Sequence, residues 1–134
     1  VKRAIQTTEI VSDYLNVPYE LNLNLREQNK GDLNGVLRTN LSDKDLIYTE
    51  NKSVDIVYPN GESLRDLYNR MKFYIEKIIA MDDDTLLITH RGVINMMYYI
   101  LYDIPLDMNK KQFGVDTASV HELDKEVRII KKVR

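Results

Sequence analysis

His90 has the setting in this chain that best suits chemistry on a substrate. It follows the short apolar run 85–89 (TLLIT), and Gly92 and the apolar stretch 93–102 come soon after it. This pattern predicts a buried strand, a tight connection and a largely buried helix. Ligands of open α/β sheets bind at the carboxyl ends of strands, and the first-turn N–H groups of a helix favour an anion. The pattern therefore predicts a site residue, and a structural His bonded to a loop carbonyl is the alternative interpretation.

Two further side chains suit an anionic substrate. Arg3 stands at the start of the first predicted helix, and a guanidinium binds phosphate or carboxylate through two parallel hydrogen bonds. Glu27 lies in a polar loop, where a carboxyl group in a cleft could serve as a general acid. The alternative for each is a solvated surface charge, and spacing alone does not decide between the two interpretations.

The apolar periodicity predicts the elements that must position these side chains. Helices are expected at 3–15, 62–81 and 93–102, one or two short helices within 37–48, strands or extended segments at 19–25, 85–89, 118–123 and 127–133, and loops at 27–35 and 51–61. Asn60 or Ser63 is expected to cap the helix over 62–81. His121 falls within a predicted strand and is interpreted as a structural or surface residue. This order of elements predicts an α/β sheet with helices on both faces.

The composition limits the classes of function. The 134 residues suit a single domain, 1–134. Nineteen basic and 21 acidic side chains give a net charge of −2, which disfavours nucleic acid or an anionic membrane as partner. The absence of cysteine excludes disulfides, thiol catalysis and thiolate metal sites, and agrees with a cytoplasmic location as the expectation. No apolar run approaches the roughly 20 residues of a membrane span.

Several motifs in one order resemble those of the histidine phosphatase superfamily, also called the phosphoglycerate mutase-like family. The resemblance covers essentially the whole chain. Its motifs are VKRAIQTTE at 1–9, similar to LxRAxQTAE; LRE at 25–27 with Gly31 and Gly35; PNGES at 59–63, similar to PGGES; LLITHRGVI at 86–94; and ASV at 118–120. The resemblance implies a three-layer sandwich in which helices flank a mostly parallel sheet.

The resemblance also implies the chemistry. Members of this family transfer or hydrolyse phosphoryl groups through a phosphohistidine, without a metal or other cofactor. By position, Arg3 matches a phosphate-binding Arg, Glu27 the general acid/base and His90 the second His of the pocket. The backbone N–H of Arg91 or Gly92 is then expected to face the phosphate.

The chain departs from the family pattern in two respects. The family's nucleophile lies in an Arg-His-Gly motif on a strand ahead of the first helix, and neither His90 nor His121 stands in such a motif. We therefore expect an N-terminally incomplete domain without that strand and loop, and expect residues 1–134 by themselves to be inactive. Arg91 replaces a common Gly, and Lys30 and Leu33 replace common aromatic residues, which leaves the substrate open.

The stretch from Gly35 to Pro59 bears on the reaction type. It is short, whereas the mutases of this family use longer inserts to close over the intermediate. We therefore expect a phosphoric monoester hydrolase that acts on a small phosphorylated metabolite, with a homodimer left open. The alternatives are a phosphoglycerate mutase-type phosphotransferase and a non-catalytic remnant that binds a phosphorylated ligand or a protein partner.

Overall fold

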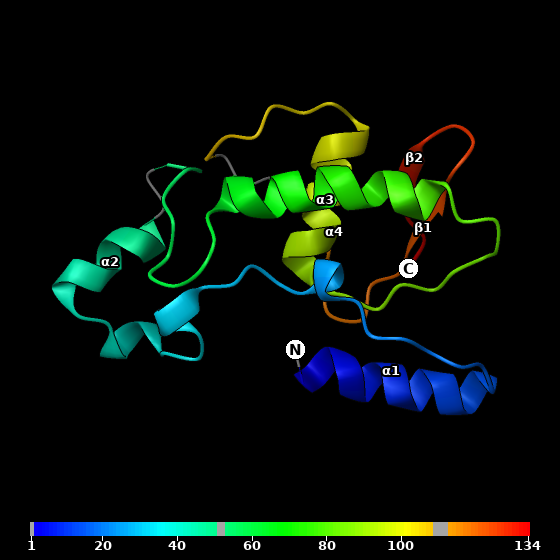
Figure 1. Cartoon of the computed structure of the whole chain (residues 1–134), viewed down its shortest axis with the longest axis horizontal. Coiled ribbons are helices and arrows are strands. Elements are labelled where there is room, and N and C mark those ends of the chain that lie inside the picture. Colours follow the sequence, from blue (N-terminus) through cyan, green and yellow to red (C-terminus); the bar gives the residue numbers. More distant parts are fainter. Residues whose placement is uncertain (1, 51–52, 109–112) are drawn as a thin grey trace.

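The described part of the chain folds into four α-helices, three short 3-10 helices and one hairpin of two strands (Figure 1). It comprises residues 2–50, 53–108 and 113–134 of a computed structural model. In chain order the elements are α1 (Lys2–Leu15), η1 (Leu23–Leu25), η2 (Gly31–Leu33), η3 (Arg38–Asn40), α2 (Asp43–Glu50), α3 (Leu64–Ile79), α4 (Arg91–Leu101), β1 (His121–Asp124) and β2 (Ile129–Lys132). Every helix predicted from the sequence is therefore present.

The helix α3 provides one half of the core. The hydroxyl of Ser63 accepts a hydrogen bond from the backbone N–H of Asp66, and the Asp66 carboxylate accepts one from the backbone N–H of Ser63. This reciprocal cap confirms Ser63 as one of the two expected caps and satisfies two N–H groups that the helix leaves free. The residues buried on α3 recur at helical spacing and are Leu67, Met71, Tyr74, Ile75 and Ile78.

The helix α4 provides the other half of the core, and α3 crosses it (Figure 1). Its buried residues are Val93, Asn95, Met96, Met97, Tyr98 and Tyr99. Val115 and Ile130 of the C-terminal part complete the same cluster. Because the first turn of α4 is anchored by this packing, residues at its N-terminus have a fixed place.

The mostly parallel sheet and the three-layer sandwich expected above do not occur in the described residues. The sheet found there has two strands, β1 and β2, which pair antiparallel with His121 opposite Lys132. The expectation of a buried strand at 85–89 is wrong here, since Leu86 is 63% exposed and no strand is formed there. An extended segment becomes a strand only when a neighbour takes its backbone groups, and no described segment pairs with 85–89 in this way.

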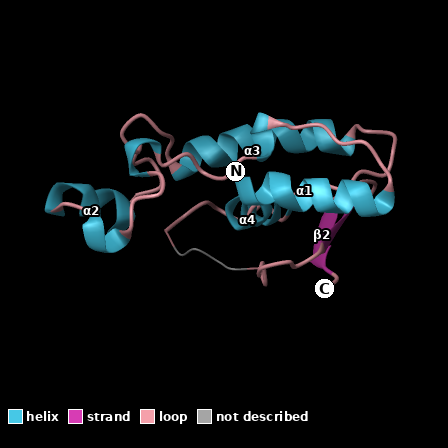
Figure 2. Ribbon diagram, turned by 90° about the horizontal axis from the view of Figure 1, so that it is seen from below, coloured by secondary structure: helices cyan, strands magenta, loops and turns pink. Residues whose placement is uncertain are grey.

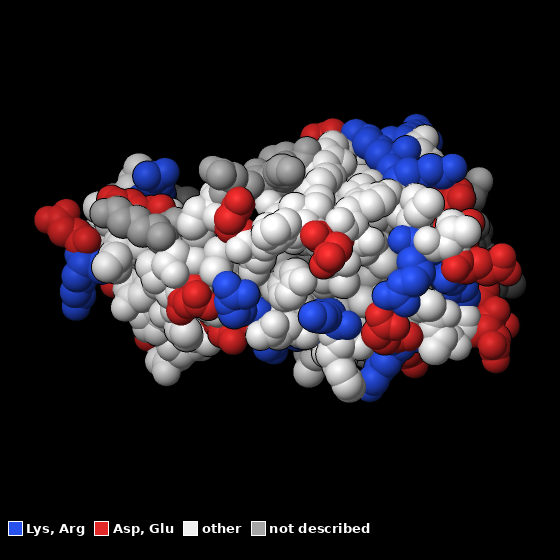
Figure 3. All heavy atoms as spheres, turned by 90° about the horizontal axis from the view of Figure 1, so that it is seen from above, with Lys and Arg blue, Asp and Glu red and all other residues white. Residues whose placement is uncertain are grey.

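The helices α1 and α2 lie outside the core. Figure 1 shows α1 set apart from α3, and Figures 1 and 2 show α2 at the far end from the hairpin. Neither helix buries a residue. Uncharged residues cover much of the face in Figure 3, with scattered charged side chains of both signs and a group of basic side chains toward one end. Within the described ranges, no helix is both long and apolar enough to cross a membrane.

Candidate functional site

The side chain of His90 lies at the N-terminus of α4. His90 is the residue before the helix, and its extended backbone (φ −123°, ψ 158°) aims the chain into the first turn. The residue is 6% exposed. Burial lowers the pKa of the His90 imidazole; the Glu27 carboxylate opposes this lowering, and the Arg3 guanidinium adds to it. The neutral form of His90 is therefore favoured.

Arg3 contacts this imidazole from α1. Its Nη2 lies 3.2 Å from His90 Nδ1 across 87 residues of sequence. A guanidinium only donates hydrogen bonds, so Nδ1 must accept, and the proton of the neutral ring is then on Nε2. This arrangement leaves the Nε2–H of His90 and the remaining N–H groups of Arg3 as donors for an anion.

The Glu27 carboxylate also contacts the N-terminus of α4. Its Oε2 accepts a hydrogen bond of 3.2 Å from the backbone N–H of Gly92, and its Oε1 accepts one of 3.0 Å from the N–H of Gln28. A Cβ atom at position 92 would lie 2.1 Å from Glu27 Oε1. A side chain at this position would displace the carboxylate, which with Gly92 present occupies the anion-favouring end of α4.

A third contact joins the two chain segments of the site. The hydroxyl of Thr89 donates a hydrogen bond of 2.6 Å to the carbonyl of Leu25. This bond holds the residues just before His90 against the residues just before Glu27. The sequence-predicted residues Arg3, Glu27, His90 and Gly92 are accordingly brought together at one place.

His121 lies outside this group, whereas Arg91 directly follows His90 in the chain. Arg91 is exposed at the first position of α4, and its charge, after that of Lys132, contributes to a lowered pKa of Asp116. His121 is held by Tyr98, whose hydroxyl lies 2.7 Å from Nδ1, and by Ser119, whose hydroxyl lies 3.0 Å from Nε2. These contacts agree with the structural interpretation of His121. In the described ranges, no three side chains of the types that bind metals cluster together.

A family model matches most of the chain. The model of the histidine phosphatase superfamily (branch 1) matches residues 1–128. The chain belongs to the histidine phosphatase superfamily. Membership places it in a family of α/β fold and enzyme-like character, as the sequence motifs indicated.

Curated relatives in the histidine phosphatase superfamily carry the name 2,3-bisphosphoglycerate-dependent phosphoglycerate mutase. The protein of Rhodopseudomonas palustris (strain BisB18) is 24% identical over 87% of this chain and 60% of its own length. That of Bradyrhizobium diazoefficiens is 25% identical over 98% of this chain and 69% of its own length. Among solved structures, TTHB049 from Thermus thermophilus is 26% identical with a TM-score of 0.54, over 75% of this chain and 54% of that one. The chain thus spans only part of the length of these histidine phosphatase relatives.

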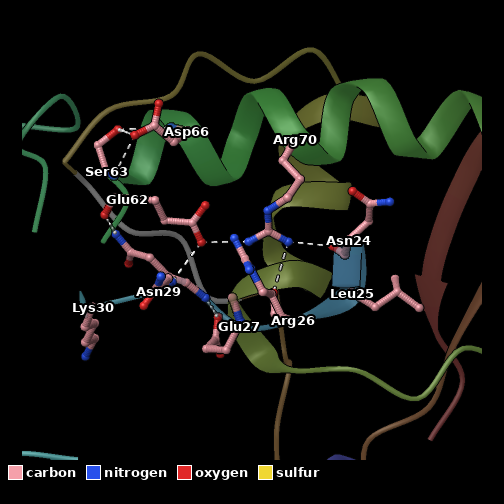
Figure 4. A network of polar contacts seen from close by, with 12 residues as sticks. Asn24, Leu25, Arg26, Glu27, Asn29, Lys30, Glu62, Ser63, Asp66 and Arg70 are labelled. Atoms are coloured by element: carbon pink, nitrogen blue, oxygen red, sulfur yellow. Dashed lines mark hydrogen bonds and ion pairs between the residues drawn. The ribbon is translucent and has the colours of Figure 1, made fainter. Parts of the chain in front are cut away.

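Arg70 lies outside the sequence motifs, and Glu62 lies within the motif PNGES at 59–63 without a role assigned to it. They form an ion pair of 2.7 Å between Arg70 Nη2 and Glu62 Oε1, with side chains 14% and 12% exposed (Figure 4). No contact between the two residues is predicted from the sequence. The other partners of these two side chains are backbone atoms of residues 24–29. Such contacts leave no pattern in the sequence, so the spacing of residues does not reveal the ion pair.

The charges around His90 predict pKa shifts of opposite direction in two variants. Replacing Arg3 by Met should raise the pKa of His90, because a positive charge that disfavours the imidazolium is removed. Replacing Glu27 by Gln should lower that pKa further, because a negative charge that favours the imidazolium is removed. Proton NMR titration of the ring C–H resonances measures both shifts.

His121 provides the control in the same spectra. Neither Arg3 nor Glu27 is among the groups that shift the pKa of His121, so its titration should not change in either variant. Shifts of His90 in the same direction in both variants would contradict the described arrangement.

Proposed function

We propose that this chain supplies the phosphate pocket and the general acid of an enzyme that hydrolyses phosphoric monoesters through a phosphohistidine. The observation that carries the proposal is the convergence of Arg3, Glu27 and His90 on the first turn of α4. Arg3 and the Nε2–H of His90 would hold the charge on the phosphoryl oxygens. Glu27 would protonate the leaving alkoxide, and the nucleophilic His would come from an Arg-His-Gly motif outside residues 1–134.

The placement of α2 supports hydrolysis over transfer between substrate hydroxyls. The stretch that contains η3 and α2 extends away from the first turn of α4 in both ribbon views (Figures 1 and 2). A pocket that this stretch does not close over admits water to the phosphohistidine, and water then competes with return of the phosphoryl group to the substrate.

The names of the relatives favour a second candidate function, that of a phosphoglycerate mutase. The two functions differ in their products.

The products can be compared in the extended form, which we define as this chain joined, ahead of residue 1, to a strand with an Arg-His-Gly motif. A hydrolase releases inorganic phosphate from p-nitrophenyl phosphate and from alkyl phosphates. A mutase converts 3-phosphoglycerate to 2-phosphoglycerate when primed with 2,3-bisphosphoglycerate, and that product without phosphate release would refute the hydrolase.

Binding of inorganic phosphate to the 134-residue chain tests the pocket without turnover. Hydrogen bonds to charged groups contribute about 1.5–3 kcal/mol, so Arg3→Ala and His90→Ala should each weaken phosphate binding about tenfold or more. Isothermal titration calorimetry measures the change. Lys2→Ala removes a neighbouring positive charge from the same end of α1 and should alter binding little. An equal loss of phosphate affinity in Lys2→Ala and Arg3→Ala would mean that Arg3 acts only through its charge. That result would contradict the proposed phosphate pocket.

A further inference from the structure

The guanidinium of Arg70 joins α3 to the chain segment that carries Glu27. Its Nη1 donates hydrogen bonds of 2.5 Å to the carbonyl of Asn24 and 3.1 Å to the carbonyl of Arg26. The second of these carbonyls belongs to the residue directly before Glu27. Figure 4 shows the Arg70 side chain reaching from α3 to this segment.

Glu62 extends the same contact to the other side of Glu27. Its Oε1 accepts from Arg70 Nη2 at 2.7 Å and from the backbone N–H of Asn29 at 2.8 Å. The backbone N–H of Glu62 donates to the Asn29 carbonyl at 2.8 Å, and the side chain of Gln28 donates to the Glu62 carbonyl at 3.3 Å. The segment is therefore held immediately before Glu27 and again one and two residues after it.

Stability alone gives a poor account of this arrangement. The free energy needed to remove two charges from water offsets much of their attraction in a buried ion pair. Well-packed apolar residues in the same place often stabilise a fold equally well or better. The Nε of Arg70 is buried without a hydrogen-bond partner, which adds to the cost. By contrast, the ion pair between Arg65 of the same helix and Asp55 of the preceding loop has exposed side chains, at 44% and 62%, and carries little cost of this kind.

We propose that Arg70 is a positioning residue that, through Glu62 and the Arg26 carbonyl, holds the Glu27 carboxylate at the N-terminus of α4. This inference rests on the proposed function only for the chemical use of Glu27, not for its placement. A general acid displaced by about 1 Å can lose about 10²-fold in rate, so a residue that fixes its backbone on both sides contributes directly to turnover.

The first experiment reads the position of Glu27 without catalysis. Arg70→Gln should release the segment and withdraw the Glu27 carboxylate from His90. Because that carboxylate opposes the lowering of the His90 pKa by burial, the pKa should fall further, as in Glu27→Gln. Loss of the Arg70 positive charge by itself would shift the pKa of His90 upward, so a fall does not come from the lost charge. NMR titration of the 134-residue chain measures it.

Three variants complete the experiment. Arg65→Gln removes a positive charge from the same helix and should leave the His90 pKa unchanged. Arg70→Gln combined with Glu62→Gln leaves no unpaired buried carboxylate, and should reproduce the fall if Arg70→Gln alone does not fold. Arg70→Gln added to Glu27→Gln should lower the pKa of His90 no further, because the Glu27 carboxylate that Arg70 positions is already absent. A His90 pKa that does not fall in a folded Arg70 variant overturns the inference.

The second experiment uses the extended form and separates the two proposals. Arg70→Gln should slow phosphorylation by an alkyl phosphate about tenfold or more, and phosphorylation by p-nitrophenyl phosphate much less. If Glu27→Gln slows both substrates equally, the acid role of Glu27 fails while the NMR result still decides the placement. If Glu27→Gln discriminates between the substrates and folded Arg70→Gln does not, the acid role stands and the role of Arg70 fails.

Discussion

Glu27→Gln in the extended form should lose about 10²–10⁴-fold in the rate of phosphorylation by an alkyl phosphate. An alkoxide is strongly basic and leaves only with a proton, which the amide of Gln does not supply. p-Nitrophenolate leaves well without a proton, so the same variant should react with p-nitrophenyl phosphate at a much less reduced rate. Single-turnover phosphorylation rates on both substrates measure the difference.

The competing role for Glu27 is structural, through its hydrogen bonds to Gly92 and Gln28. That role predicts equal losses on the two substrates together with a lowered melting temperature. Glu9→Gln removes an exposed carboxylate of α1 and should change neither rate. Equal losses in Glu27→Gln would remove Glu27 from the role of acid.

Gly31→Ala should destabilise the fold by about 3–5 kcal/mol. Gly31 has φ +54°, which disfavours any side chain, and its added Cβ would lie 1.8 Å from the carbonyl oxygen of Pro59. The backbone of the two loops would have to separate, which breaks the hydrogen bond of 2.9 Å from Asp32 N–H to that carbonyl. Urea unfolding of the chain, followed by circular dichroism, measures the loss.

Gly35 is a matched control for the conformational part of this effect. It has φ +76°, and an added Cβ would meet no atom within 4 Å. Gly35→Ala should therefore cost only the strain of the left-handed backbone, about 1–2 kcal/mol. Similar losses at the two positions would mean that the close approach of the two loops contributes nothing to stability.

Features with local causes are predicted well from the sequence. The expected helix at 62–81 is found as Leu64–Ile79, because its apolar spacing and the cap at Ser63 act within a few residues. The C-terminal hairpin is likewise confirmed, with shorter strands than expected. A sheet depends on which segments lie beside one another, and the apolar character of 85–89 carries no information on a partner strand. This is why the expected strand there is not found.

The site follows a similar division. The motifs and the strand–helix junction identify Arg3, Glu27, His90 and Gly92, which the structure brings together, although their catalytic roles stay predictions. Arg70 could not be identified, because it contacts backbone carbonyls and no sequence pattern records where a distant carbonyl lies.

The contacts that assemble the site join residues far apart in the chain, and this has a thermodynamic consequence. Arg3 and His90 are 87 residues apart, and Glu27 and Gly92 are 65 apart, whereas α3 and α4 are joined by the short segment 80–90. Closing a loop of about 90 residues costs about 2 kcal/mol more in chain entropy than closing one of about 10. That is similar to what one hydrogen bond of a charged group contributes. A single site contact therefore gains little net free energy by closing its own loop, and the pocket depends on the packing of the two core helices.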